Sequence, residues 1–237
     1  MIPADEQTPH VDADLARDIA EAVFVAEVES GNIPIGDRQV EGILADFRAR
    51  VCEIAAPPEG DSPDQFEFLF AIDHRDSLLE KARLHATAGL HEIALILYAT
   101  WIEHSINAII SRGLERKGIS SKSTLTLLKE VRNQKAKITA LWEVAGIPAM
   151  DAELAASIQR IADLRNAFVH YKWHGESGDT DAQSSKDRYT AATEECAATS
   201  AALAATEESF YWDGRRDEVL TAFHSQRPGS RKETTGY

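Results

Sequence analysis

The chain has 237 residues, of which 43% are hydrophobic and 27% are charged, as in an ordinary globular protein. No apolar run is long and uninterrupted enough to predict a membrane span, and the first residues show no secretion signal. The two cysteines, Cys52 and Cys196, stand in no disulfide or metal-ligand spacing. We therefore expect a cytoplasmic protein that neither crosses a membrane nor carries a metal or other cofactor.

The formal net charge of -14 is distributed unevenly along the chain. Residues 1–80 contain 19 acidic and 5 basic residues, whereas the other 157 residues contain 20 of each. Eight basic residues are concentrated in positions 111–137, namely Arg112, Arg116, Lys117, Lys122, Lys129, Arg132, Lys135 and Lys137. This polarity allows a polyanion to dock on the second half of the chain. A solvated helix face explains the same run equally well.

Helical periodicity dominates the chain, and convincing strand alternation is scarce. We expect helices over residues 14–29, 37–55, 75–117 (with a break near Gly89), 124–145, 151–173 and 187–212. The proline-rich segment 55–64 is the best linker candidate. The sequence thus predicts an all-α protein with three parts: an acidic helical N-terminal region (1–64), an antiparallel helical bundle (65–214) and a disordered C-terminal tail (215–237).

Arg165 occupies an unexpected position in the helix predicted over 151–173. Projection at about 100° per residue places it in the middle of the apolar stripe, with Asn166 and His170 together on one flank. A guanidinium on an apolar face needs an anionic partner or a water-filled cleft. One interpretation is a structural ion pair, for which Glu103 is a candidate partner. The other is a site that binds phosphate.

The string RNAFVHY, residues 165–171, resembles the Arg-(polar)-x-x-x-His signature of the HEPN superfamily, with asparagine in the favoured polar position. The preceding helix, with Glu103 in Ala-Thr-Trp-Ile-Glu-His, resembles that family's early helix with its glutamate. The resemblance covers about residues 75–212 and leaves 1–64 unexplained. In some toxin members a tyrosine stands two residues after the histidine, a place that Lys172 takes here.

The resemblance implies a metal-independent endoribonuclease of HEPN type, with a helical bundle of the HEPN type as its fold. Arg165, Asn166 and His170 are then the catalytic residues, and Glu103 supports them. Histidine, with a free pKa of about 6.5, can act as general acid or base, and the arginine fork stabilises the phosphate. One histidine does not easily supply both acid and base. The resemblance therefore implies a homodimer in which two motifs share one cleft.

Residues near the motif and in the basic run are candidates for contact with the RNA substrate. The rings of Tyr171 and Trp173 could stack on bases while Lys172 meets phosphate. Arg132 and Lys135 of the basic run are further candidates for substrate binding. Trp173 could equally close the helix onto the core.

The resemblance also implies a toxin–antitoxin or phage-defence setting, with a cognate antitoxin protein as a second partner. Two other functions are compatible with the same residues. The first is a non-catalytic HEPN-like module that binds a nucleotide or a partner through Arg165. The second is a structural interaction protein in which Arg165 is an ion-pair residue.

Overall fold

The computed structural model describes residues 13–55, 74–169 and 182–225, and all regular secondary structure in these ranges is helical. The predicted all-α class is therefore confirmed for the described part of the chain. The chain divides into two units, Met1–Glu59 with Tyr211–Tyr237, and Gly60–Phe210. The C-terminal segment thus belongs to the same unit as the acidic N-terminal segment.

The first unit contains α1 (Ala13–Glu29), α2 (Val40–Ala55) and α10 (Arg216–Ser225). Its core is aromatic: the ring of Phe24 lies 5.0 Å from the rings of both Phe47 and Phe223, centroid to centroid. The disordered tail predicted from residue 215 is wrong for 216–225, because Val219 and Phe223 on α10 supply apolar side chains to this unit, Val219 being fully buried. The rest of that predicted tail, 226–237, lies outside the described residues.

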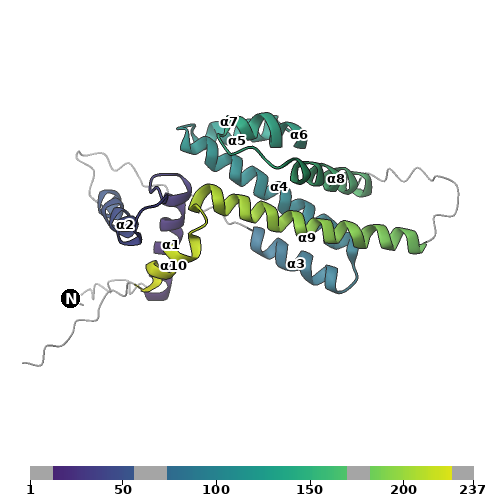
Figure 1. The fold of residues 1–237 in the computed structure, drawn as a ribbon, viewed down its shortest axis with the longest axis horizontal. Helices are drawn as coiled ribbons and strands as arrows, with labels where there is room; N and C mark the ends of the chain where they lie inside the picture. The colour runs from purple at the N-terminus through teal and green to yellow at the C-terminus, as the bar shows by residue number, and fades with distance from the viewer. Residues whose placement is uncertain (1–12, 56–73, 170–181, 226–237) are drawn as a thin grey trace, which may run out of the picture. The chain divides into compact units, whose positions relative to one another are not determined.

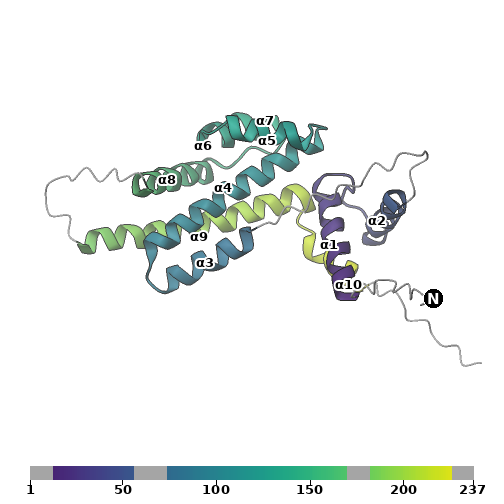
Figure 2. The same cartoon turned by 180° about the vertical axis from the view of Figure 1, so that it is seen from behind.

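The second unit is a bundle in which α3 (Arg75–Thr87), α4 (His91–Arg116), α8 (Ala152–Val169) and α9 (Ala182–Trp212) lie side by side, each antiparallel to the one before it (Figures 1 and 2). The shorter helices α5 (Ser121–Glu130), α6 (Gln134–Ala136) and α7 (Trp142–Val144) connect α4 to α8. A π-helix, η1 (Lys137–Leu141), joins α6 to α7.

The central helix α4 supplies most of the core of this unit. Twelve of its residues are buried, including Trp101, Ile102, Ile106 and Ile109. By length and composition alone α4 could span a membrane, but 56% of its most apolar window is buried inside the structure. A helix that packs against neighbours on several sides is expected to be apolar over most of its surface. Its composition is therefore accounted for by the core.

Two glycines shape the packing around α4. The predicted break near Gly89 is confirmed, since α3 ends at Thr87 and Gly89 adopts a φ of 73°, a conformation that favours glycine. Within α4, a Cβ on Gly113 would lie only 2.8 Å from the carbonyl oxygen of Ala145. The absence of a side chain at Gly113 thus lets the segment after α7 approach the helix closely.

The single basic helix predicted over 124–145 is wrong. The helix begins earlier, at Ser121, where the hydroxyl of Ser120 accepts a hydrogen bond from the backbone N–H of Ser123. It ends at Glu130, and a new helix begins after Asn133, whose side chain accepts a hydrogen bond from the N–H of Ala136. Asparagine is a favoured N-cap, so Asn133, which the prediction places inside a helix, instead starts one.

Candidate functional site

Glu103 of α4 lies between two cations that come from different elements. Its Oε2 accepts a hydrogen bond from the Arg165 guanidinium of α8 at 2.7 Å. Its Oε1 lies 3.9 Å from Nζ of Lys137, which belongs to the π-helix. The ion pair that the structural interpretation of Arg165 predicts is therefore present. The side chains of Arg165 and Glu103 remain 29% and 39% exposed, however, so the pair is open to solvent.

Lys137 is the most enclosed cation of this group, with a side chain only 5% exposed. Its ammonium donates a hydrogen bond to Oδ1 of Asn107 at 2.8 Å. Burial lowers the pKa of Lys137, and the nearby Glu103 carboxylate opposes that shift. Lys137 belongs to the π-helix, in which Ile138 and Leu141 are buried with it. Such π segments are frequent at functional sites.

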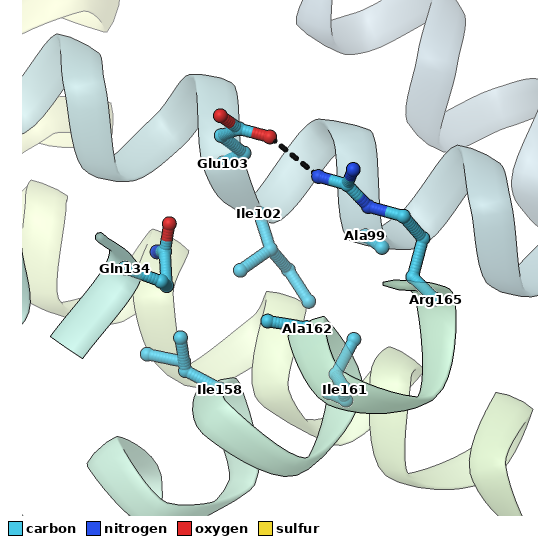
Figure 3. Close-up of a pocket in the computed structure, with 8 residues that line it drawn as sticks. All are labelled: Ala99, Ile102, Glu103, Gln134, Ile158, Ile161, Ala162 and Arg165. Atoms are coloured by element: carbon cyan, nitrogen blue, oxygen red, sulfur yellow. Dashed lines mark hydrogen bonds and ion pairs between the residues drawn. The ribbon is translucent and has the colours of Figure 1, made fainter. Parts of the chain in front are cut away.

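Two hollows border the Glu103–Arg165 pair. The smaller, a crevice of about 10 Å³ shown in Figure 3, has room for about one water molecule. The larger, of about 350 Å³, is called here the carboxamide cleft, because four of its side chains are amides. It is lined by Glu103, Arg132, Asn133, Gln134, Gln159, Ala162, Asp163, Arg165 and Asn166. Glu103, Gln134, Ala162 and Arg165 line both hollows.

Three buried polar atoms at this place have no hydrogen-bond partner. They are Nε2 of Gln134, Oε1 of Gln159 and Nε of Arg165, and all three residues line the carboxamide cleft. In Figure 3, Gln134 and Arg165 stand on opposite sides of the crevice, with Glu103 between them. Buried polar groups in folded proteins are normally paired, so a cluster of exceptions calls for an explanation.

The structure brings together some of the residues that the sequence singled out. Arg165, Asn166, Glu103 and Arg132 all line the carboxamide cleft. Lys135 is exposed and does not line it. The other predicted site residues lie outside the described residues, since α8 is described to Val169. They are His170, Tyr171, Lys172 and Trp173.

The basic run divides into engaged and exposed side chains. Four of its members make intramolecular contacts: Arg112 with Glu115, Arg116 with the carbonyl of Phe210, Lys117 with the carbonyl of Val144, and Lys137 with Asn107. The other four, Lys122, Lys129, Arg132 and Lys135, are exposed and make no ion pair with a described residue. This second group, together with the exposed Lys117, whose bond to a carbonyl leaves its charge in place, can offer charge to a polyanion.

The sequence reading did not single out Gln134, Gln159 or Lys137 as a group. For the α8 side a signal existed: Gln159, Asp163 and Asn166 follow the spacing i, i+4, i+7 and so share one helix face. Gln134 and Lys137 gave no comparable signal, because they lay inside the helix that was predicted as continuous. Asn133 was the available clue, since it can end one helix and cap the next.

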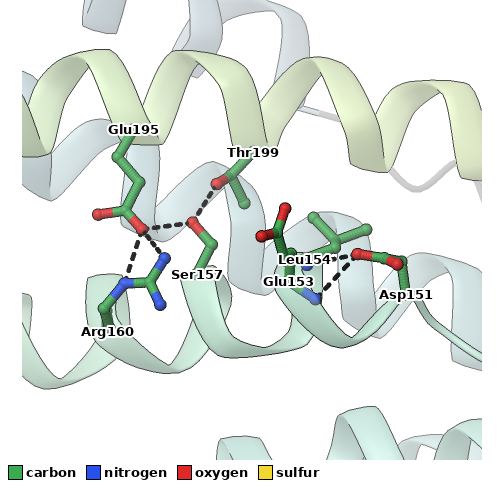
Figure 4. A network of polar contacts seen from close by, with 7 residues as sticks. All are labelled: Asp151, Glu153, Leu154, Ser157, Arg160, Glu195 and Thr199. Carbon is green, nitrogen blue, oxygen red and sulfur yellow. Dashed lines mark hydrogen bonds and ion pairs between the residues drawn. The ribbon is translucent and has the colours of Figure 1, made fainter.

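The opposite face of α8 carries a second polar group, the Ser157 network (Figure 4). The Ser157 hydroxyl donates to Oε1 of Glu195 on α9 at 2.7 Å and lies 2.7 Å from the hydroxyl of Thr199. Arg160 donates through Nε to the same carboxylate oxygen at 2.9 Å. None of these four described side chains has a buried polar atom without a partner.

Other chemically active side chains offer less. Burial raises the pKa of the Cys196 thiol to about 12, so this cysteine is a neutral core residue near pH 7 rather than a nucleophile. Among the described residues, no group of three or more His, Cys, Asp or Glu side chains is arranged to hold a metal ion.

Comparisons with protein-family models, with curated proteins and with solved structures find no match for this chain. Its function must therefore be inferred from its own residues. The carboxamide cleft presents a guanidinium with N–H donors left over from its one ion pair, next to amides that can both donate and accept. This arrangement suits a ligand with an anionic group and a polar, hydrogen-bonding body.

Proposed function

We propose that this protein is a metal-independent endoribonuclease of the HEPN type, built on a bundle of that type. The observation that carries the proposal is the position of Arg165. Its guanidinium is fixed by one ion pair to Glu103 on the wall of an open polar cleft, and the sequence places His170 five residues later. A planar fork of donors next to a histidine is the pair of groups that cleavage of a phosphodiester requires.

The reaction follows from the chemistry of these two side chains. The 2′-oxygen of the ribose attacks the adjacent phosphorus, and the 5′-oxygen of the next nucleotide leaves with a proton. The products are a 2′,3′-cyclic phosphate and a free 5′-hydroxyl. Histidine removes or supplies the protons, while Arg165 stabilises the charge that develops on the phosphorane. Asn166, which is exposed on the cleft wall, is available to orient the histidine or the phosphate.

Two copies of the chain would supply the two histidines that acid and base catalysis need, so the proposal includes a homodimer. Single-stranded RNA is the substrate that suits an open cleft. A toxin–antitoxin or phage-defence role belongs to the same proposal, with an antitoxin protein as the partner that restrains the activity. A cytoplasmic location is the compartment in which such a nuclease would meet its RNA.

The deciding experiment is RNA cleavage by the purified protein in EDTA, compared with His170→Ala and Arg165→Ala. We expect cleavage by the wild type that leaves cyclic phosphate ends, and loss of cleavage in both variants. Growth arrest on expression, relieved by His170→Ala, is a second readout in cells. Equal RNA degradation by all three proteins would indicate a contaminant and would contradict the proposal. The absence of degradation by any of the three would contradict it as well.

One observation favours a second candidate, a non-catalytic module that binds a nucleotide or a protein partner. The ion pair with Glu103 satisfies part of the hydrogen-bonding capacity of the Arg165 guanidinium without any ligand. Such a pair is what an arginine with a structural or binding role would require. This candidate predicts RNA or nucleotide binding, or dimerisation alone, with no cyclic phosphate product. The cleavage assay therefore separates the two.

A further inference from the structure

The carboxamide cleft leaves three buried polar atoms unsatisfied at one place. The orientation of Gln159 is fixed, because its Nε2 donates to Oδ1 of Asp163 at 2.9 Å and leaves Oε1 as the unpaired acceptor. Nε2 of Gln134 and Nε of Arg165 are the two unpaired donors. Each atom has lost its contact with bulk water without gaining a protein partner. A ligand that offers two acceptors and one donor would satisfy all three.

The charge of the lining defines what kind of ligand this is. Two arginines and two acids balance one another, and four side-chain amides complete the wall. A site for phosphate alone would not include two carboxylates. A site for a peptide anchor would be largely apolar, whereas Ala162 is the sole apolar residue among those that line this cleft. The lining therefore suits a neutral, planar group with several donors and acceptors.

We propose that the carboxamide cleft is a nucleobase subsite for single-stranded RNA, in which Gln134 and Gln159 recognise the base edge. This inference rests on the proposed function, in which N–H groups of Arg165 other than Nε meet the neighbouring phosphate, while Nε stays a donor for the base. Side-chain amides are common partners of base edges, and proteins read unpaired RNA by hydrogen bonds to these edges. A cleft of about 350 Å³ falls in the lower part of the range for small-ligand sites, as expected for one nucleotide.

The inventory of unpaired atoms also predicts a preference among the bases. The Watson–Crick edges of cytosine and uracil each present two acceptors and one donor, and that of adenine presents one of each. The Watson–Crick edge of guanine presents two donors and one acceptor. With the Gln134 amide oriented as in the structure, the protein offers two donors and one acceptor, so guanine should be the least favoured base when its Watson–Crick edge enters the subsite.

The test uses 2′-O-methyl trinucleotides whose central base is A, C, G or U and whose flanking positions lack bases. These probes cannot be cleaved through the 2′-hydroxyl, so their affinity for the full-length protein is independent of catalysis. We expect the probe with guanine to bind roughly tenfold more weakly than the best of the others. We expect Gln134→Leu and Gln159→Leu each to remove most of that difference.

Two further variants control for misfolding and for the chemical change itself. Gln134→Glu replaces the donor by an acceptor of the same shape, which complements the two donors of guanine, so it should abolish or reverse the preference even if the leucine variant folds poorly. Gln39→Leu makes the same chemical change at an exposed position of the other unit and should leave the preference intact. Equal affinity for all four probes, or no binding of any probe, overturns the inference, as does a preference that persists in all the cleft variants.

The outcomes separate this inference from the proposed function. If the wild type cleaves RNA in EDTA but binds the four probes equally, the nuclease stands and the base subsite fails. If the probes bind with the expected preference but no RNA is cleaved, the subsite stands and the nuclease fails.

Discussion

The two faces of helix α8 carry polar groups of opposite character. On one face, Arg165 meets Glu103 at the carboxamide cleft, where three buried polar atoms lack partners. On the other face, Arg160 meets Glu195 in the Ser157 network, where every buried polar atom is paired (Figure 4). Both arginines bind a glutamate of a neighbouring helix, so the ion pairs alone do not distinguish the two places.

The difference lies in what surrounds each pair. Ser157 and Thr199 are buried, 8% and 3% exposed, and together with Glu195 they satisfy one another, so the network can hold α8 against α9 without a ligand. The cleft is lined by two amides, Gln134 and Gln159, with an unpaired buried atom, and its Glu103 also lies beside the nearly enclosed ammonium of Lys137. A fully paired polar group stabilises a fold, whereas an incompletely paired one costs stability and is typical of a site that binds something.

The largest expected effect is on RNA cleavage, and it compares the two arginines directly. Arg165→Lys keeps the positive charge but loses the planar fork, so we expect cleavage to fall by about 100-fold or more. Arg160→Lys makes the same change in the Ser157 network and should alter cleavage less than about twofold. Initial rates on one RNA, with circular dichroism to check folding, measure both. Equal losses would mean that neither arginine acts on the substrate.

The next effect is on stability and concerns the two glutamates. Glu103→Gln leaves the buried ammonium of Lys137 without a carboxylate, so we expect a loss of about 2–3 kcal/mol, less than for a fully buried pair because Glu103 is partly exposed. Glu195→Gln keeps a hydrogen-bond acceptor beside a largely exposed Arg160 and should cost below about 1 kcal/mol. Denaturant unfolding of both variants measures the difference.

A double variant checks the cause of that loss. Adding Lys137→Met to Glu103→Gln removes the unpaired buried charge and should restore most of the lost stability. If the double variant is as unstable as Glu103→Gln alone, then the contact between Lys137 and Glu103 is not what the substitution breaks.

These two faces were not equally predictable from the sequence. Periodicity predicts a helix over 151–173, which the structure shows for 152–169, and it predicts the unusual position of Arg165, for which Glu103 was a candidate carboxylate partner. The cleft itself did not follow, because its far wall is formed by Arg132, Asn133 and Gln134 at the helix break. Such a break is a local departure from the 3.6-residue period on which the prediction depends.

The distant contacts of the fold were harder still to predict. Nothing in the spacing of Ser157, Glu195 and Thr199 indicates that they meet, because pairing between helices depends on their packing and not on local pattern. The same holds for α10, whose short apolar pattern does not by itself predict a packed helix. Its Phe223 becomes a core residue only by stacking on Phe24, about 200 residues earlier in the chain.

A smaller effect on stability should have opposite signs at the two faces. Ser157→Ala leaves the buried Thr199 hydroxyl short of a partner and should destabilise the protein by about 1–2 kcal/mol. Gln134→Leu removes a buried donor that has no partner, so it should be neutral or stabilise by up to about 1 kcal/mol. Unfolding midpoints at one pH compare the two. A clear loss in Gln134→Leu would mean that its amide is already satisfied in the free protein.

The smallest expected effect is a dependence of stability on pH that comes from Lys137. Burial holds the pKa of Lys137 below its ordinary value of 10.5 in the folded protein. Between that lowered pKa and 10.5 the unfolded chain binds more protons than the folded one, so this lysine makes the free energy of unfolding rise with pH in that window. Below the folded pKa the lysine is charged in both states and adds no slope.

Other groups titrate in the same range, so the measurement must be a difference. Burial raises the pKa of Tyr98 and of Tyr189, which makes stability fall with rising pH and opposes the contribution of Lys137. Both tyrosines are also present in the Lys137→Met variant. Their contributions therefore cancel when the variant's free energy of unfolding is subtracted from that of the wild type. We expect this difference to shift in favour of the wild type as pH rises through the lowered pKa of Lys137 toward 10.5. A difference that stays constant would place the Lys137 ammonium in an environment that solvates it as well as water does, and Glu103 would then lack the enclosed cation that sets its ion pair apart from that of Glu195.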